Sequence, residues 1–251
     1  MDEPVGSPDD VLAIDIGATN IKFARVDAQG RARSSIKRRP TPYPCPPERL
    51  VSWVAQRIAN FDVERVGVGF PGEFEDGHVI RPGNLSRISG VGSALDADLD
   101  ACWHGFPLEE TLRHETGRDV RVVNDATLAA LGCCRGVGTE LVVTLGTGSG
   151  LALRVDGQRR RVRDLGREAF DEERSFDVAL GERARAHDER AWRRDVVAAI
   201  SALAAEFGAG RVFLAGGNAR RLSPEAFAGR GFAIEIAGNE VSLRGAARLF
   251  T

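Results

Sequence analysis

An aspartate interrupts an apolar run near the start of the chain, in the segment VLAIDIGATNIKFARV at residues 11–26. The aliphatic and β-branched residues around Asp15 predict a buried strand, in which a carboxylate without a partner would be costly. Residues 17–19 suit a tight turn, and residues 21–26 alternate well enough for a returning strand. A hairpin whose turn offers a carboxylate and backbone N–H groups can hold a phosphate with its magnesium ion. An ordinary hairpin with an aspartate in its turn is the alternative interpretation.

Two further glycine-rich turns follow predicted strands, at residues 146–150 and 216–218. Glycine lets backbone amides approach an anion or a planar base closely. One such turn is weak evidence because turns generally favour glycine, but three at strand ends favour a nucleotide or polyphosphate site. The chain contains no GxxxxGK[ST] motif, which excludes a P-loop enzyme. A GxGxxG pattern occurs at residues 67–72, but its glycines lie within a predicted strand, so no Rossmann site is expected.

The expected elements come in a similar order in the two halves of the chain. Each half opens with a glycine-rich hairpin and continues with helices and further strands. Helices are expected at residues 47–60, 106–116 and 189–207, after the turn at 216–218, and at the closing segment. This repetition predicts a duplicated α/β architecture with a cleft between the halves. We expect one lobe at residues 1–117, rejoined by the C-terminal helix at 238–251, and a second lobe at 118–237.

The composition limits the functions open to the chain. Its 251 residues are 43% hydrophobic and 28% charged, as in soluble globular proteins, and the formal net charge of -2 argues against nucleic-acid binding. The acidic segment at residues 1–10 is neither a signal nor a transit peptide, and no apolar stretch is long enough for a bilayer. The four cysteines show no CxxC spacing and the histidines are isolated. We therefore expect a cytoplasmic protein without a zinc site or a membrane partner.

Five segments, in order along the chain, together resemble the ROK family of sugar kinases: DIGATNIK, GFPGEFEDGHVIRPGN, VVNDATLAALG, TLGTGSG and LAGGNARR. That family belongs to the ASKHA superfamily (actin, hexokinase, Hsp70). Within it, the chain is most similar to the short branch that contains bacterial polyphosphate glucokinases, which lacks the family's cysteine-rich zinc motif. The resemblance implies a two-lobed, ribonuclease H-like α/β fold with duplicated domains and a central cleft. It also implies Mg2+ with ATP or polyphosphate, a small sugar or sugar-like substrate, no structural zinc, and allows for a homodimer.

The resemblance also implies roles for single residues. Asp15 is similar to the phosphate-loop aspartate that acts through magnesium. Other positions that resemble donor-binding ones are Gly17, Thr19, Lys22, Gly146, Thr147, Gly148, Gly216 and Gly217. Positions that resemble sugar-binding ones are Gly72, Asn84, Asn124, Asp164 and Arg167. Asp125 is similar to the general base; because it follows a strand and begins a helix, an N-cap role for Asn124 and Asp125 is the alternative, and the two roles are compatible.

Two neighbouring segments contain arginines whose role the family resemblance leaves open. The family usually carries Glu-x-Gly-His where this chain has Asp164, Leu165, Gly166 and Arg167. An arginine donates only, whereas a neutral histidine also accepts, so ordinary glucose recognition is in question. Arg167 either pairs with a carboxylate or phosphate on a different acceptor or forms a salt bridge with Asp164 or Glu168. The segment RRRVRD at residues 159–164 is either a solvated basic strand or a track for a polyphosphate donor.

These observations predict a magnesium-dependent kinase that transfers a phosphoryl group from ATP or polyphosphate to a hydroxyl of a sugar or sugar-like acceptor. The alternative is a catalytically weak or inactive member of the family that binds sugar or nucleotide as a regulator.

Overall fold

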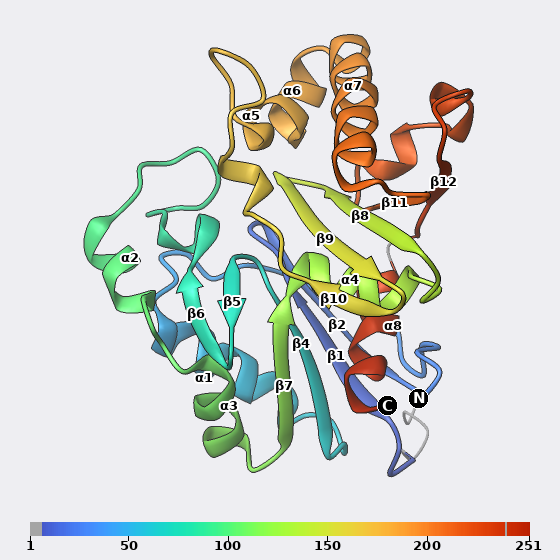
Figure 1. Ribbon diagram of the computed structural model, residues 1–251. Helices are drawn as coiled ribbons and strands as arrows, with labels where there is room; N and C mark the ends of the chain where they lie inside the picture. Colours follow the sequence, from blue (N-terminus) through green and yellow to red (C-terminus); the bar gives the residue numbers. More distant parts are fainter. Residues whose placement is uncertain (1–6, 239) are drawn as a thin grey trace. The chain divides into compact units, whose positions relative to one another are not determined.

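The computed structural model describes residues 7–238 and 240–251 (Figure 1). Residues 1–6, part of the acidic N-terminal segment, and residue 239, part of the predicted closing helix, lie outside it. The chain divides into two compact units: Met1–Gly132 with Ser242–Thr251, and Cys133–Val241. The first unit extends beyond the predicted boundary at residue 117 because the next strand hydrogen-bonds to the first sheet.

Each unit contains a five-stranded mixed sheet of the same design. In the first the order is β3-β2-β1-β4-β7, with β1 at Val11–Ile16, β2 at Asn20–Val26, β3 at Lys37–Pro40, β4 at Arg65–Phe70 and β7 at Asp119–Asn124. In the second it is β10-β9-β8-β11-β12, with β8 at Thr139–Leu145, β9 at Ser149–Val155, β10 at Gln158–Arg160, β11 at Arg211–Ala215 and β12 at Ala233–Ile236. In both sheets the first three strands are antiparallel and the last two join in parallel. The predicted duplicated α/β fold is confirmed.

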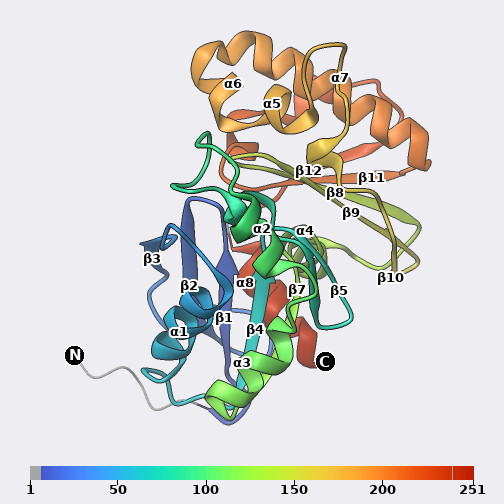
Figure 2. The ribbon, with the colours of Figure 1, turned by 90° about the vertical axis from the view of Figure 1, so that its left-hand side faces the viewer.

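The alternating side chains of β1 separate the two faces of the first sheet. Leu12 and Ile14 belong to the core under α1 (Pro47–Ile58) and α3 (Leu108–Thr116), which lie on the same face in Figure 2. Val11 and Ala13 instead pack with residues of α4 (Asp125–Cys133) and α8 (Val241–Ala247). Asp15, in phase with Val11 and Ala13, therefore faces the α4 and α8 side.

Helix α8 packs very closely on α4. A Cβ atom at Gly245 would lie 1.9 Å from the backbone oxygen of Leu128, so only glycine allows this approach. The contact brings the closing segment of the chain to the sheet face that carries Asp15. Among the helices of the described part of the chain, none has the length and hydropathy needed to cross a bilayer.

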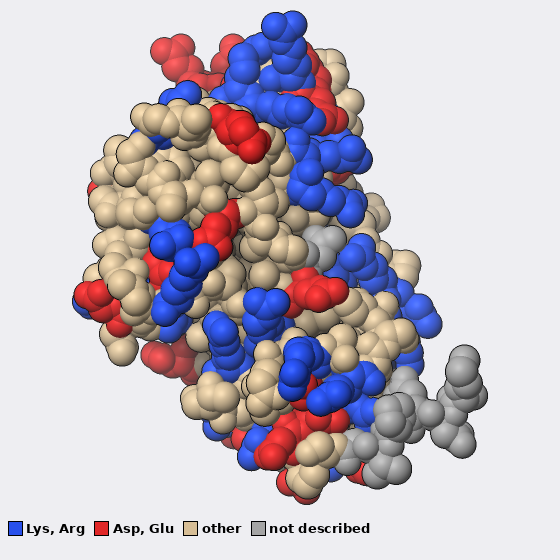
Figure 3. All heavy atoms as spheres, turned by 90° about the vertical axis from the view of Figure 1, so that its right-hand side faces the viewer, with Lys and Arg blue, Asp and Glu red and all other residues tan. Residues whose placement is uncertain are grey.

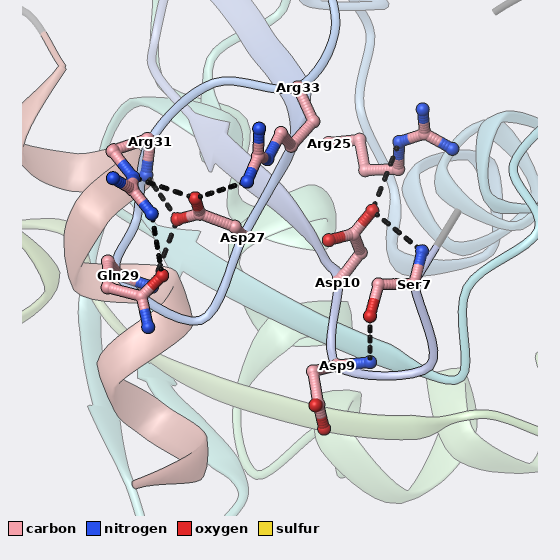
Figure 4. Close-up of polar contacts among 8 residues, drawn as sticks. All are labelled: Ser7, Asp9, Asp10, Arg25, Asp27, Gln29, Arg31 and Arg33. Carbon is pink, nitrogen blue, oxygen red and sulfur yellow. Dashed lines mark hydrogen bonds and ion pairs between the residues drawn. The ribbon is translucent and has the colours of Figure 1, made fainter. Parts of the chain in front are cut away.

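The end of the β1–β2 hairpin away from its turn is held by two buried aspartates (Figure 4). Asp10 Oδ2 lies 3.5 Å from Arg25 Nε, and Asp27 Oδ2 lies 2.8 Å from Arg31 Nε and 3.1 Å from Arg33. Burial raises the pKa of Asp27, but hydrogen bonds from the backbone and side chain of Arg31 outweigh it and leave that pKa below its usual value. These aspartates anchor the hairpin and lie at the opposite end of β1 from Asp15.

In the second unit, α7 (Glu189–Phe207) covers one face of the sheet. Its buried residues Trp192, Val196 and Ile200 join a core with alternate residues of β8 and β11. The predicted helix at 189–207 is confirmed, and those at 47–60 and 106–116 are confirmed with slightly shorter bounds. Short helices α5 (Phe176–Leu180) and α6 (Glu182–His187) precede α7.

Other local predictions were wrong. After the turn at residues 216–218 there is only a 3-10 turn at Ala219–Arg221, because Ser223-Pro224 follows and the residue before a proline disfavours helix. The segment after β4 forms a hairpin, β5 (Glu73–Glu75) and β6 (His78–Arg81), which the sequence did not reveal because its strands are so short. Helix α2 (Ala97–Trp103) follows this hairpin.

Candidate functional site

The carboxylate of Asp15 has two polar partners at the end of β1. Lys22 Nζ lies 3.0 Å from Oδ2, and the Ser242 hydroxyl donates to the same oxygen at 2.9 Å. Asp15 is opposite Lys22 in the β1–β2 ladder, and its side chain is 13% exposed. The ion pair explains why the strand tolerates a largely buried carboxylate. Mg2+ commonly binds one or two carboxylates together with substrate phosphates, so the partly exposed carboxylate of Asp15 suits this ion.

The β1–β2 turn is fixed by the segment that follows β3. Thr41 Oγ1 donates to the Gly17 carbonyl at 2.7 Å, and its backbone N–H donates to the Thr19 carbonyl at 3.1 Å. The Tyr43 hydroxyl donates to the Ala18 carbonyl at 2.8 Å, and burial raises the pKa of that hydroxyl. The predicted phosphate turn is therefore held through its carbonyl groups.

The carboxylate of Asp15 and the backbone of the predicted general base Asp125 both lie close to Gly69, in the neighbouring strand β4. A Cβ atom at Gly69 would lie 3.6 Å from Asp15 Oδ1 and 3.5 Å from the Cα atom of Asp125. Strand β4 lies between β1 and β7, so the carboxyl ends of the three parallel strands place these groups side by side. Sequence reasoning dismissed Gly69 as part of a Rossmann decoy, but a Cβ atom there would also lie 2.8 Å from Leu128 Cδ2, so the close packing at this point favours glycine.

Asn124 is the residue that caps the start of α4, and Asp125 is the first residue of that helix. Asn124 Oδ1 accepts from the backbone N–H groups of Ala126 and Thr127, at 3.0 and 3.2 Å, which is the N-cap arrangement. Asn124 Nδ2 donates to the Gly72 carbonyl at 2.8 Å. Asp125 is the first residue of the helix, and its Oδ1 accepts from Ala126 at 2.7 Å. Most of the capping thus falls to Asn124.

The other predicted sugar-binding residues of the first unit lie near this helix start or in the loop after β6. A Cβ atom at Gly72 would lie 2.2 Å from the Arg81 carbonyl oxygen, so this position requires glycine. Asn84 lies in a 3-10 turn at Gly83–Ser86, and its Oδ1 accepts from Arg87 Nε at 2.9 Å. Its carbonyl oxygen lies 3.3 Å from the oxygen of the Tyr43 hydroxyl, whose single proton has its shorter contact, 2.8 Å, with the Ala18 carbonyl. Tyr43 therefore lies in contact with both the β1–β2 turn and the loop that carries Asn84.

In the second unit the structure brings two predicted donor turns together. Gly146 N–H donates to the Gly148 carbonyl at 2.9 Å, which closes the β8–β9 turn. Asn218, directly after Gly216 and Gly217, donates through Nδ2 to the Gly146 carbonyl at 2.9 Å. Gly216 has a φ of 88°, and a Cβ atom there would lie 2.3 Å from the Leu145 carbonyl oxygen. The two glycine-rich turns thus form one continuous backbone surface.

Asp177 is the main residue of this region that sequence reasoning missed. Its Oδ1 accepts from the Ser149 backbone N–H at 2.6 Å and lies 3.3 Å from the Ser149 hydroxyl. Cβ atoms at Gly148 and Gly166 would lie 2.4 and 2.5 Å from the same oxygen. The carboxyl group therefore fills the space between the β8–β9 turn and the loop of Arg167.

Burial raises the pKa of Asp177, and the nearby charge of Asp164 raises it further. The Ser149 hydrogen bonds and the charge of Arg167 act in the opposite direction but do not cancel the increase. Asp177 is thus electrostatically coupled to both charged residues of the DLGR segment. No local pattern could have revealed this, because Asp177 and Ser149 are 28 residues apart.

Arg167 ends a 3-10 turn at Leu165–Arg167, where Leu165 is buried and Arg167 is exposed. Among residues 7–238 and 240–251, none of the ion pairs includes Arg167. Glu168 pairs instead with Arg163, at 2.5 Å. The salt bridge from Arg167 to Asp164 or Glu168, one of the two predicted alternatives, is therefore not formed.

The predicted basic strand at residues 159–164 is confirmed only for Arg159 and Arg160, which lie exposed in β10. Strand β10 ends at Arg160, and Arg163 forms a two-pronged contact with Glu206, with Nη2 at 2.8 Å from Oε2. These hydrogen bonds raise the pKa of Arg163. Figure 3 shows Lys and Arg next to Asp and Glu across the face that it draws. Because Arg163 is committed to carboxylates, it does not extend a single-sign track.

Metal ligands are sparse in the described part of the chain. No group of three or more His, Cys, Asp and Glu side chains that could hold a metal ion occurs there. Its four cysteines are free thiols, and burial raises the pKa of Cys45 to about 12. A magnesium ion would thus depend on substrate phosphates as well as on Asp15.

Comparison with known sequences identifies the family. The sequence model of the ROK family matches residues 11–162, which include the Asp15 strand, Asn124, Asp125 and the β8–β9 turn. The chain belongs to the ROK family. The resemblance in the sequence is thereby confirmed, while the roles of single residues stay predictions.

Named relatives of this ROK protein include a curated enzyme, the N-acetylmannosamine kinase of Escherichia coli (strain SMS-3-5 / SECEC). The two are 32% identical over 145 residues, which make up 55% of this chain and 45% of that kinase. The chain thus matches about half the length of this relative.

Solved structures match over nearly the whole chain. The inorganic polyphosphate/ATP-glucomannokinase of Arthrobacter sp. strain KM has 28% identity and a TM-score of 0.72, with 95% of this chain and 96% of that one covered. The ROK family glucokinase of Streptomyces griseus, in complex with glucose and AMPPNP, has 22% identity and a TM-score of 0.71, with 96% and 98% covered. The second comparison concerns the fold alone.

Proposed function

We propose that this ROK protein is a magnesium-dependent kinase that transfers a phosphoryl group from ATP or polyphosphate to a hydroxyl of a sugar or sugar-like acceptor. The observation that carries this proposal is the approach of the Asp15 carboxylate and the Asp125 Cα atom to the same residue, Gly69, at the carboxyl ends of neighbouring strands. Phosphoryl transfer needs little covalent chemistry from a protein, but it needs charge neutralisation at the phosphates and a carboxylate that orients the attacking hydroxyl. The first unit offers one acidic group for each task.

Asp125 is the proposed general base. Its carboxylate would accept the proton of the acceptor hydroxyl as the oxygen attacks the terminal phosphorus atom. Asn124 supports this role because it caps α4 and bonds the Gly72 carbonyl, so the start of the helix is held in place. Asn84 and Asn124 supply amide groups that would hydrogen-bond to sugar hydroxyls.

Asp15 is the proposed residue for the metal. Its Oδ2 contacts Lys22 and Ser242, while Oδ1 lies toward Gly69. A bound Mg2+ would neutralise phosphate charge there, held by the phosphates and by Asp15. Lys22 would contact both the donor phosphates and Asp15, since an ammonium group attracts phosphate oxygens as well as a carboxylate.

The proposed donor surface of the second unit is the joined backbone of the turns at residues 146–148 and 216–217. The two turns approach each other closely, which the absence of a side chain at Gly216 allows. This supports a role with phosphates for Gly146, Thr147 and Gly148. It supports a role with the adenosine part of the donor for Gly216 and Gly217. The use of ATP or polyphosphate is suggested by the name of the Arthrobacter enzyme.

Arg167 is the proposed determinant of an unusual acceptor. It is exposed and forms no ion pair among the described residues, so its guanidinium group can receive a carboxylate or phosphate. Substitution Arg167→His would restore the residue usual in the family. We expect the variant to gain or raise glucose kinase activity at unchanged thermal stability; no change for any acceptor would contradict the altered-pocket idea.

A phosphotransfer screen with magnesium tests the proposal. ATP and polyphosphate would be offered with hexoses, N-acetylated amino sugars, sugar acids and polyols. Asp125→Asn should lower kcat by roughly 100- to 10,000-fold, as is typical for the loss of a general base. Asp119→Asn, at the other end of β7 and exposed, is the matched control and should keep full activity.

Turnover that survives in Asp125→Asn would refute the base assignment. Silence with every acceptor, together with thermal stabilisation by sugar or nucleotide, would favour the regulator without turnover.

A further inference from the structure

The loop that carries Asn84 also contains an arginine, Arg87, which lies outside the five segments that resemble the ROK family. Arg87 Nε donates to Asn84 Oδ1 at 2.9 Å, and Nη1 of the same guanidinium group donates to the Ser93 carbonyl. Asn84 belongs to the 3-10 turn at the start of the loop, and Ser93 to the segment before α2. One half-buried arginine thus joins the proposed sugar-binding residue to the far side of its loop.

The contact with Arg87 fixes the orientation of the Asn84 amide. A guanidinium group carries only donors, so the amide must direct its oxygen to Arg87 and its NH2 group away from it. Among the residues that the structure describes, none accepts a hydrogen bond from Asn84 Nδ2, and this nitrogen is not a buried atom. Its N–H groups are therefore available to a bound molecule.

The loop around Ser93 is closed by its own hydrogen bonds and by packing on Tyr43. The Ser93 hydroxyl donates to the Gly90 carbonyl at 2.7 Å and accepts from the Ser89 backbone N–H at 3.1 Å. Gly90 has a φ of 91°, and a Cβ atom there would lie 2.9 Å from the Tyr43 ring. The carbonyl that holds the second arm of Arg87 is thus itself fixed in place.

Asn124, the other proposed sugar-binding amide of the first unit, is oriented in the same sense. Its Oδ1 accepts from two backbone N–H groups of α4, and its Nδ2 donates to the Gly72 carbonyl, which leaves one N–H. A Cβ atom at Gly83, next to Asn84, would lie 2.3 Å from the Pro71 carbonyl oxygen, so the two amides adjoin the same segment. Both amides direct their oxygens into the protein.

We propose that Arg87 is a positioning residue, which orients the Asn84 amide so that it donates to an oxygen atom of the acceptor. This role rests on the proposed function, in which Asn84 binds the sugar, and adds to it the residue that sets the direction of that hydrogen bond. The charge of Arg87 also polarises the amide and so strengthens its N–H groups as donors. Of the three proposed acceptor-binding side chains of this unit, only the Asp125 carboxylate would then accept a hydroxyl proton.

Sugar affinity in a double-mutant cycle tests the role of Arg87. D-Glucose, N-acetylmannosamine and D-glucuronate are titrated without a phosphoryl donor into the wild type, Arg87→Gln, Asn84→Ala and the double variant, and NMR shifts give Kd. Arg87→Gln should raise Kd roughly ten-fold, the loss typical of one hydrogen bond. In the Asn84→Ala background the same substitution should change Kd by less than about two-fold, because the amide that Arg87 orients is absent.

Arg113→Gln is the matched control. Arg113 also donates to a backbone carbonyl, that of Val120, and contacts a side-chain oxygen, that of Glu109, but it lies in α3. Its substitution removes the same charge and should leave Kd unchanged. Thermal melting verifies folding; if Arg87→Gln does not fold, Arg87→Lys replaces it, since a lysine keeps the charge but cannot bridge both oxygens.

Each outcome decides the proposal. An unchanged Kd in Arg87→Gln, or a rise that persists in full in the Asn84→Ala background, would overturn it, and so would a wild type that binds none of the three sugars. The expected cycle without turnover in the phosphotransfer screen would refute the kinase and keep the role of Arg87. Where turnover occurs, Arg87→Gln should raise KM for the acceptor and leave kcat and the donor KM unchanged; a fall in kcat alone would refute this role and keep the kinase.

Discussion

The two glycine-rich hairpins of this protein occupy equivalent places in their sheets but are stabilised in different ways. Each joins the first two antiparallel strands of a five-stranded sheet. At the β1–β2 turn the carboxylate belongs to the strand itself, and Asp15 is paired with Lys22. At the β8–β9 turn the carboxylate comes from α5, and Asp177 accepts the Ser149 backbone N–H.

The difference concerns what each acid does. Asp15 keeps a cation and a hydroxyl as neighbours, so its charge is balanced and stays usable for a metal. Burial raises the pKa of Asp177, and its carboxyl group fills space that Gly148 and Gly166 leave open. A duplicated backbone can thus place one acid for charge and another for shape.

The strongest test of the shape argument is Gly216→Ala. The new Cβ atom would lie 2.3 Å from the Leu145 carbonyl oxygen, at a φ of 88° that alanine disfavours. We expect the free energy of unfolding to fall by about 3 kcal/mol, the combined range for backbone strain and overpacking. Urea denaturation of the purified variant measures it.

Gly217→Ala is the control for this change, because a Cβ atom there meets nothing within 4 Å. It should cost less than about 1 kcal/mol. Equal losses of unfolding free energy at the two glycines would show that the close approach at Gly216 does not determine the stability of this region.

Asp177→Ala should have the next largest effect. It leaves the part-buried Ser149 N–H without an acceptor, which typically costs about 1–3 kcal/mol. The proposed donor turn would also loosen, so we expect KM for the phosphoryl donor to rise more than kcat falls. Stopped assays across donor concentrations separate the two constants.

Asp177→Asn is the conservative counterpart, since its amide oxygen can still accept from Ser149. It should restore most of the stability and of the donor KM. Failure of asparagine to rescue either quantity would mean that the negative charge, and not the hydrogen bond, supports the turn.

The sequence was sufficient for the parts of the site that are local. The strand before Asp15, the turn after it and the N-cap at Asn124 follow from residue types within a few positions. Contacts between distant segments were not predictable. Ser242 reaches Asp15 across 227 positions, and Gly69 comes between Asp15 and Asp125 only because β4 lies between β1 and β7. Strand order, which no local pattern encodes, decides both.

The pH dependence of stability distinguishes Asp177 from an ordinary surface acid. The raised pKa means that the unfolded chain releases this proton first, so the contribution of Asp177 is fully present below about pH 4 and is lost as pH rises through the folded pKa. Asp177→Asn cannot ionise. The stability of this variant relative to the wild type should therefore increase as pH rises from about 4.

Asp188→Asn gives the opposite sign. The Asp188 carboxylate caps α7 by accepting from Ala191, and this hydrogen bond lowers its pKa. Its contribution is present above the unfolded pKa and is lost as pH falls through the folded one. Parallel slopes for the two variants in urea denaturation between about pH 3 and 7 would contradict the raised pKa of Asp177.

The smallest expected effect concerns the β1–β2 hairpin, where Lys22 balances the charge of Asp15. Ser242→Ala removes one hydrogen bond to Asp15 but leaves the Lys22 ion pair, so the free energy of unfolding should fall by about 0.5–1.5 kcal/mol. Ser201→Ala, whose hydroxyl only donates to a carbonyl within α7, is the control and should change less. A loss larger than that of Asp177→Ala would reverse the comparison, because Asp15 would then depend on its hydrogen bond to α8 more than on Lys22. A loss within this range, with the magnesium requirement of turnover shifted, would support Asp15 as the acid kept for charge.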